Sequence, residues 1–224
     1  IIPFITIYFI YLLIRSENKK ALVISVLSGG ILGLLISAYF WIPAILENKY
    51  KKVSLLTTEL ANYNLHFVSL PQFFNSPWGY GGSILGPQDG LSLEIGKIHI
   101  ILASFAVVLF AFNIIKKKQS NVFILPFVII LILSVFLQSY YSKIIWDKIP
   151  ALSYIQFPWR FMIFTVFSVS FLGGYIFSLK FDQKAKIILA AALVFFTILF
   201  YSSLFKPERL LLNAKDSDYI SKEV

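Results

Sequence analysis

Residues 98–115 read IHIILASFAVVLFAFNII, an apolar run without aspartate, glutamate, lysine or arginine, and Lys116–Lys118 follow at once. At about 1.5 Å rise per residue, such a run is long enough to cross the roughly 30 Å hydrocarbon layer of a membrane as an α-helix. In lipid, each backbone N–H and C=O group must find its partner within the segment, so a helix is the expected structure. The stretch therefore predicts a transmembrane helix that ends at a basic loop.

The same alternation of apolar runs and short charged clusters continues along the chain. Of its 224 residues, 58% are apolar and 14% are charged, whereas soluble domains have about 25% charged residues. We expect an all-α polytopic membrane protein of about six transmembrane helices. The first span has only 14 residues before Arg15 and is expected to lack its N-terminal part, so the sequence is expected to be a fragment of a longer protein. The predicted spans are residues 1–14, 21–46, 98–115, 119–142, 161–179 and 187–205.

The short connections between these spans predict the orientation of the protein. Residues 15–20, 116–118 and 180–186 together hold nine basic and two acidic side chains. Basic residues in short loops resist translocation, so these loops are expected in the cytoplasm. The net charge of +9 then reflects topology and attraction to membrane lipids, and nucleic acid is not an expected partner. Residues 47–97, 143–160 and 206–224 are expected outside, the last as the beginning of an extracytoplasmic C-terminal segment.

One further uncharged stretch, Leu60–Gln88, could be mistaken for a span. It contains prolines, glycines and several amides, which disrupt a helix and need hydrogen-bond partners in lipid. A crossing there would also place the first basic loop opposite the second. We therefore expect residues 47–97 to form one long extracytoplasmic loop, with a short interfacial helix over Thr58–Phe74.

Small residues and a proline mark the second predicted span. Gly29, Gly33 and Ser37 recur at four-residue spacing, which lets a neighbouring backbone approach closely. This pattern is typical of packing within one molecule and also of helix dimers, so the oligomeric state stays open. Pro43 is expected to bend or stop the last turn of the helix.

The long loop carries most of the candidate binding residues. Trp78 and Tyr80 lie between glycines, and their ring faces suit a sugar or a lipid headgroup. Asp89 could bind hydroxyls or a cation, or could form an ordinary Asp-Gly turn. Glu94 is a second acidic candidate, whose alternative is a solvated pair with Lys97.

Arg160 follows Trp159 where the fifth predicted span begins. Its guanidinium could bind a lipid phosphate through paired hydrogen bonds, or could serve only as an interfacial anchor. His66 and His99 are the two histidines of the chain, which has no cysteine. Two histidines so far apart are a weak zinc signal, and no metal site is expected. No nucleotide-binding, zinc-protease or G-x-S-x-G pattern occurs.

Three motifs together resemble a known family. They are the helix end Phe40-Trp41-Ile42-Pro43-Ala44, the loop Ser76-Pro77-Trp78-Gly79-Tyr80-Gly81 with Asp89-Gly90 and Gly96, and Phe157-Pro158-Trp159-Arg160-Phe161. The chain looks like the prokaryotic membrane proteins called 6-pyruvoyl-tetrahydropterin synthase-related, over roughly residues 38–174. Those proteins are similar to GT-C glycosyltransferases, which take a sugar from a polyprenyl-phosphate donor at the extracytoplasmic face.

The resemblance implies a multi-pass protein of the prokaryotic cell membrane, with a polyprenyl-phosphate-linked sugar as its partner. In that scheme Trp78 and Tyr80 stack on the sugar, Asp89 binds hydroxyls or a cation, and Arg160 holds the donor phosphate. The acidic catalytic motif of GT-C enzymes lies in an earlier loop, which would precede Ile1. No residue here matches it, so the catalytic residues stay unknown and a divalent cation belongs to the full-length protein.

Two other functions remain open from the sequence. One is a non-catalytic protein that handles or transports lipids or glycans, which would need polar groups along the spans. The predicted spans hold few of them beyond scattered serines, threonines and Asn113. The other is a structural membrane protein. Whether the chain is an enzyme is therefore not decided by its sequence.

Overall fold

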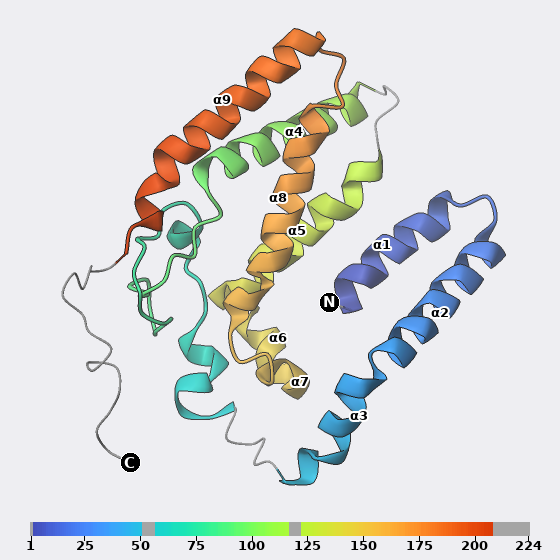
Figure 1. Cartoon of the computed structure of the whole chain (residues 1–224), viewed down its shortest axis with the longest axis vertical. Helices are drawn as coiled ribbons and strands as arrows, with labels where there is room; N and C mark the ends of the chain where they lie inside the picture. Colours follow the sequence, from blue (N-terminus) through green and yellow to red (C-terminus); the bar gives the residue numbers. More distant parts are fainter. Residues whose placement is uncertain (1, 51–56, 117–121, 208–224) are drawn as a thin grey trace, which may run out of the picture. The chain divides into compact units, whose positions relative to one another are not determined.

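The computed structural model describes residues 2–50, 57–116 and 122–207, and Figure 1 shows the course of the chain. Within these residues the regular structure is entirely helical, apart from one isolated bridge between Val68 and Ser139. The chain divides into two compact units, residues 1–180 and residues 181–224. Four described helices are long and apolar enough to cross a membrane: Lys19–Ile36, Lys97–Ile115, Pro158–Ile176 and Gln183–Phe205.

The first unit is built on three helices that pack together, α1 (Ile2–Arg15), α5 (Leu125–Gln138) and α8 (Met162–Ile176). Phe4 at the start of α1 stacks on Phe164 near the start of α8, with ring centroids 3.9 Å apart. The ring of Tyr11, near the end of α1, has its centroid 6.2 Å from that of Phe123, which lies just before α5. Helices α1 and α8 therefore run in the same direction, and α5 runs against them (Figure 1).

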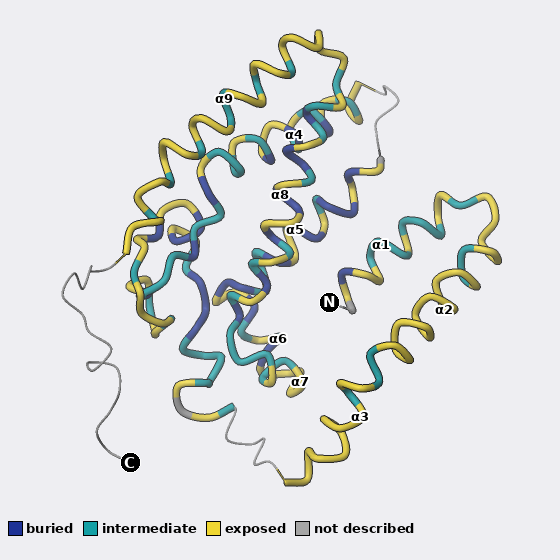
Figure 2. Tube along the Cα trace, viewed as in Figure 1, coloured by how far each residue is buried: buried dark blue, intermediate teal, exposed yellow. Residues whose placement is uncertain are grey.

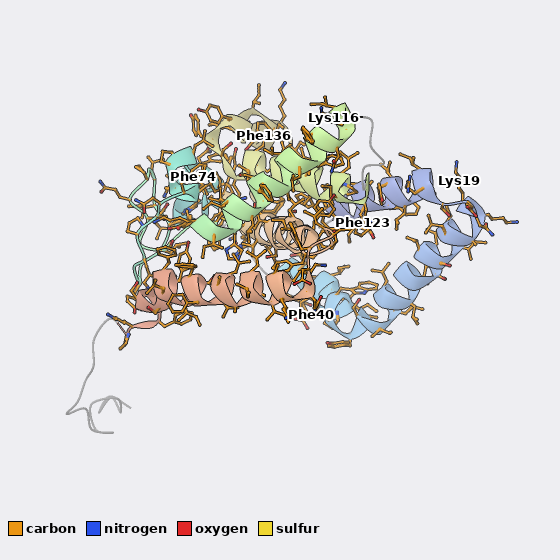
Figure 3. All side chains as sticks on the ribbon, turned by 90° about the horizontal axis from the view of Figure 1, so that it is seen from above. Lys19, Phe40, Phe74, Lys116, Phe123 and Phe136 are labelled. Carbon is orange, nitrogen blue, oxygen red and sulfur yellow. The ribbon has the colours of Figure 1, made fainter. Side chains whose placement is uncertain are left out.

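Helix α4 (Lys97–Ile115) packs against α8 and begins one residue before the apolar run in the sequence. Its contact with α8 includes Gly173, where a Cβ atom would lie 3.6 Å from the Leu102 side chain. Carbon dominates the side chains that project from the helices in Figure 3, where Lys19 and Lys116 are labelled at helix ends. Lysines placed at the two ends of apolar segments suit a helix that spans lipid.

The predicted second span is broken into α2 (Lys19–Ile36) and α3 (Ala38–Leu46), and the break lies at Ser37 instead of Pro43. The Ser37 hydroxyl donates to the Gly33 carbonyl oxygen at 2.8 Å, a bond that competes with the regular helix ladder. The Trp41 indole N–H donates to the Leu34 carbonyl at 2.9 Å. Ser37 and Trp41 thus donate hydrogen bonds to backbone carbonyls at the break. Pro43 lies inside α3.

The predicted span 119–142 is also shorter in the structure, although residues 119–121 lie outside the described part. Two single turns, η6 (Val122–Ile124) and η7 (Tyr140–Ser142), flank α5. The chain leaves the helix at Ser139, whose backbone is extended. The short helices α6 (Lys143–Lys148) and α7 (Pro150–Ser153) then lead to η8 (Pro158–Phe161), which opens α8.

Burial is concentrated in α5, α8 and the segment around residues 66–73, as Figure 2 shows. By contrast, α2 and α3 have no buried residue. In the second unit, α9 (Gln183–Tyr201) with the turn η9 (Ser202–Phe205) likewise has none. Apolar helices with exposed surfaces are expected where lipid takes the place of a protein core. The fold is thus compatible with an integral membrane protein.

A buried polar cluster joins α5 to α8. The side chains of Ser134, Gln138 and Thr165 have no exposed surface. The hydroxyl oxygens of Ser134 and Thr165 lie 2.9 Å apart, and the Gln138 amide donates to Thr165 at 2.8 Å. Hydrogen bonds between apolar helices fix their pairing because their polar groups have no better partner in lipid.

The loop between α3 and α4 is folded, and it lacks the continuous helix that the sequence predicted over Thr58–Phe74. In its place are the turns η3 (Glu59–Ala61), η4 (Tyr63–Leu65) and η5 (Leu70–Phe73), after η1 (Asn48–Tyr50). The Asn62 side chain caps η4 by accepting from the Asn64 backbone N–H at 3.0 Å, and Pro71 lies in the first turn of η5. Each of these residues favours a new turn over helix continuation.

Candidate functional site

The loop has an apolar core of its own, which rests on α5 and α8. Val68, Phe73 and Leu93 are buried together and pack against Val135 and Met162 of the two helices. The backbone N–H of Val68 donates to the Gln138 carbonyl at 2.9 Å, where α5 ends. The loop is therefore positioned by the same end of the bundle at which α8 begins.

Glycines allow the tip of the loop to close tightly. Gly81 donates its N–H to the Gly90 carbonyl, and Gly90 donates to the Gly82 carbonyl, each at 2.9 Å. A Cβ atom on Gly90 would lie 2.6 Å from the Gly81 Cα atom, and one on Gly79 would lie 2.6 Å from the Gly90 carbonyl oxygen. A Cβ atom at Gly79 or Gly90 would therefore force the neighbouring backbone to shift.

Trp78 and Tyr80 lie at this closed tip. Their rings meet edge to face with centroids 6.2 Å apart, and 49% and 55% of their surfaces are exposed. Two large exposed rings held beside each other form an amphipathic surface of the kind on which sugar rings pack. The structure therefore brings together this part of the candidate site.

Asp89 lies inside the loop, with 8% of its surface exposed. One carboxylate oxygen accepts from the Gln72 amide at 2.6 Å, and the other accepts from the backbone N–H of Ile84 at 2.7 Å. The Gln72 amide also donates to the Pro87 carbonyl at 3.3 Å. In this arrangement Asp89 holds the loop together and turns both oxygens toward protein donors. Both contacts run to residues earlier in the loop and differ from the Asp-Gly turn that the sequence also suggested.

Glu94 and Lys97 lie further along, where the chain enters α4. Glu94 is half-buried, and its backbone N–H lies 3.4 Å from the Ser92 hydroxyl. Lys97 is the exposed first residue of α4. Both side chains lie in the segment that leads from the loop into α4, and each of them takes part in a contact.

Arg160 lies exposed in the turn η8. Its Nη1 atom donates to the Ile155 carbonyl at 2.9 Å, and its guanidinium carbon lies 4.9 Å from the centre of the Phe157 ring. No carboxylate in the described part of the chain forms an ion pair with it. The guanidinium is therefore held in place while keeping its charge for an anion.

An open apolar cavity of about 590 Å³ lies between α1, α5 and α8. Its walls include Phe4, Phe127, Phe164, Phe167 and Phe171. Phe127 and Phe171 are stacked with centroids 3.7 Å apart. The α8 members follow Arg160 by four, seven and eleven residues, the spacing of one helix face. The turn η8 thus carries a cation just before α8, and the following turns of α8 carry aromatic rings that line the cavity.

Three residues that the sequence did not group form a chain of hydrogen bonds beside Arg160. The Trp159 indole N–H donates to the Ser83 hydroxyl at 2.9 Å. The Ser83 oxygen lies 2.7 Å from Nδ1 of His66, whose Nε2 atom lies 2.6 Å from the Leu60 carbonyl. Their separation along the chain hides the cluster, and the only signal was that Trp159 directly precedes the candidate Arg160.

A second polar group ties the loop to α6. Lys143 and Asp147 form an ion pair at 2.7 Å, and the Tyr63 hydroxyl donates to Asp147 at 2.7 Å. The bond from Lys143, followed by that from Tyr63, holds the pKa of Asp147 below its ordinary value of 3.8. The same bond to Asp147 raises the pKa of Lys143, and burial raises that of Tyr63.

The histidine and carboxylate side chains of the described residues do not form a metal site. Among the described residues, no three histidine, aspartate or glutamate side chains gather into a possible metal site. Both ring nitrogens of His66 already face protein atoms, while Nδ1 of His99 is buried without a described partner.

No protein family, curated protein or solved structure matches the chain. Its class is therefore that of an all-helical protein with apolar helices compatible with membrane insertion.

Proposed function

We propose that the chain is the membrane-embedded part of a GT-C-like glycosyltransferase, which moves a sugar from a polyprenyl-phosphate donor at the outer face of the membrane. The observation that carries the proposal is that Arg160, in the turn η8, is followed along α8 by Phe164, Phe167 and Phe171, which line the apolar cavity. A cation followed by an apolar groove matches a molecule with an anionic head and a long hydrocarbon tail. The guanidinium would bind the phosphate, and the phenylalanines would line the tail.

The loop supplies the surface for the sugar in this proposal. Trp78 and Tyr80 are exposed, paired and fixed by the close approach of glycines beneath them. Sugar rings pack their C–H faces against aromatic rings, while water and polar side chains serve their hydroxyls. During transfer, the Arg160 guanidinium would stabilise the negative charge that develops on the departing phosphate.

The test uses the full-length protein in vesicles, with undecaprenyl phosphate and undecaprenol as paired probes. Arg160→Ala should weaken phosphate-lipid binding by about tenfold or more, because a charge-assisted hydrogen bond contributes roughly 1.5–3 kcal/mol. Binding of the uncharged alcohol should change little. Arg15→Ala is the matched control, since it removes the arginine at the opposite end of a helix. Equal losses for both lipids, or none, would remove Arg160 from the site.

A second function, binding of lipid-linked glycans without chemistry, is favoured by the position of Asp89. This acid is the nearest along the chain to the aromatic pair, and both of its oxygens are engaged inside the loop. Transfer of a labelled sugar from a polyprenyl-phosphate donor to added acceptors separates the two functions. Turnover that Trp78→Ala reduces supports the transferase, whereas tight donor binding without turnover supports the binding protein.

A further inference from the structure

We propose that Ser83 and His66 form a second, catalytic site, at which Ser83 is a nucleophile that takes the acyl group of a carboxylic ester. The Ser83 hydroxyl lies within hydrogen-bond distance of Nδ1 of His66, at 2.7 Å. A hydroxyl paired with an imidazole that is itself held by a third group is the arrangement of nucleophilic catalysis. The site differs from the proposed glycosyl transfer in its reacting residues and in its reaction, and it has Arg160 as a neighbour in common with it.

The Leu60 carbonyl selects the tautomer of the His66 ring. A carbonyl oxygen can only accept, so Nε2 of His66, at 2.6 Å from it, carries the ring proton. In the neutral imidazole, Nδ1 is then the acceptor and faces the Ser83 hydroxyl. His66 is 4% exposed, so its ring is fixed in this orientation, while Ser83 is half-buried and reachable from the loop surface.

Two further contacts suit Ser83 to its role. The Trp159 indole N–H, at 2.9 Å, donates to the same hydroxyl oxygen and would stabilise negative charge as the proton leaves. Asp89 accepts from the backbone N–H of Ile84, the residue after Ser83, and so fixes the backbone at the nucleophile. The rings of His66 and Phe157 meet edge to face with their centroids 4.6 Å apart, and the Arg160 guanidinium lies over the same Phe157 ring.

The reaction is an acyl transfer in two balanced steps. His66 takes the hydroxyl proton as the Ser83 oxygen bonds to the ester carbonyl carbon. The tetrahedral adduct then expels the alcohol, which leaves with the proton from His66. Water, deprotonated by His66, next attacks the acyl-serine. The new adduct releases the carboxylic acid and expels the Ser83 oxygen, which takes the proton back from His66. The substrate class is an ester of a membrane amphiphile, because His66 and the Arg160 guanidinium contact the same Phe157 ring, just before the apolar helix α8 begins.

A fluorophosphonate probe tests the nucleophile in the detergent-solubilised full chain. The expected result is one modified peptide, carrying the probe on Ser83, identified by mass spectrometry. Ser83→Ala should abolish the labelling, and His66→Gln should slow it by about 100-fold or more, the usual contribution of a general base. Ser92→Ala is the matched control, because its hydroxyl donates to the Ser76 carbonyl within the same loop.

Trp159→Phe separates catalysis from a merely structural hydrogen bond. It keeps an aromatic ring beside Phe157 and removes the N–H donor, so labelling should slow by about tenfold while the thermal midpoint of unfolding moves little. Hydrolysis of 4-nitrophenyl butyrate should fall in the same order across the variants. If the wild-type chain takes up no probe at Ser83, or labels equally fast in His66→Gln, the assignment is wrong. Neither result bears on polyprenyl-phosphate binding.

Discussion

At the scale of single residues, Gly90 is a position where a methyl group decides the stability of the loop. Its backbone exchanges hydrogen bonds with Gly81 and Gly82, and a Cβ atom there would lie 2.6 Å from a backbone atom. Gly90→Ala should therefore lower the free energy of unfolding by about 1–3 kcal/mol, the usual range for overpacking. Thermal unfolding in detergent measures the change.

Gly82 provides the control for this prediction. It lies in the same tip and has open space where its Cβ atom would be. Gly82→Ala should leave the thermal midpoint nearly unchanged. Similar losses for the two variants would mean that the close approach at Gly90 is not what limits the loop.

Asp147 gives the loop a dependence on pH. Because its pKa is lower in the folded chain than the ordinary 3.8, its contribution to stability is present above about pH 4 and is lost as the pH falls through the lowered value. Tyr63 acts at alkaline pH. Because its pKa is raised above the ordinary 10.0 in the folded chain, its contribution to stability is present below about pH 10 and is lost as the pH rises through the raised pKa. The Tyr63 contact should thus be intact between about pH 4 and 10.

Tryptophan fluorescence reports this contact, because Tyr63 stacks on Trp146 with ring centroids 5.3 Å apart. An acid titration of the folded protein should show a transition below pH 4. Asp147→Asn should remove that transition, and Asp182→Asn, in the second unit, should keep it. A transition that persists in Asp147→Asn would assign the signal to another group.

At the scale of elements, α5 and α8 depend on their buried polar cluster. Thr165→Val preserves shape and removes the contacts to Ser134 and Gln138. We expect a loss of about 1 kcal/mol in the free energy of unfolding, since interhelical hydrogen bonds in membranes average roughly 0.6 and reach about 1.7 kcal/mol. Unfolding by titration with sodium dodecyl sulfate from mixed micelles measures it.

Thr197 of α9 is the matched control for Thr165. Its hydroxyl donates at 2.7 Å to the Leu193 carbonyl of its own helix. Thr197→Val should therefore cost only a few tenths of a kcal/mol. An equal cost for the two substitutions would show that loss of any hydroxyl, and not of the bond between helices, explains the effect.

The elements also show where sequence reasoning is reliable. Charges at both ends of an apolar run predict α4 to within one residue, because lipid and water specify those ends independently of tertiary contacts. The break at Ser37 was not predicted, since proline is the stronger helix breaker and the rescue of the Leu34 carbonyl by Trp41 depends on side-chain placement.

The candidate site was predictable only in part, for a similar reason. Exposed rings such as Trp78 follow from their glycine-rich surroundings, which is a local signal. The contacts between His66, Ser83 and Trp159 depend on how the loop folds against α8, and spacing along the chain carries no trace of them.

At the scale of the whole molecule, the orientation of the basic loops stays a prediction, and the chain offers a direct test because it has no cysteine. Single cysteines at Lys19, Lys116 and Lys184 should all resist a membrane-impermeant maleimide in intact cells. A cysteine at Leu85, which is 71% exposed, should react. If the cysteine at position 116 reacts while the one at position 19 is protected, the two basic loops lie on opposite sides of the membrane. That result would contradict the predicted alternation of spans.

The parallel bridge between Val68 and Ser139 has a consequence for biosynthesis. The ribosome delivers the loop well before α5 and α8, the two helices on which it rests. Chains fold as they emerge, at about 5–20 residues per second. The loop can therefore complete these contacts only several seconds after its own synthesis, once α5 and α8 have been made. Premature termination before α8 would leave the loop without one of the two helices against which its core packs.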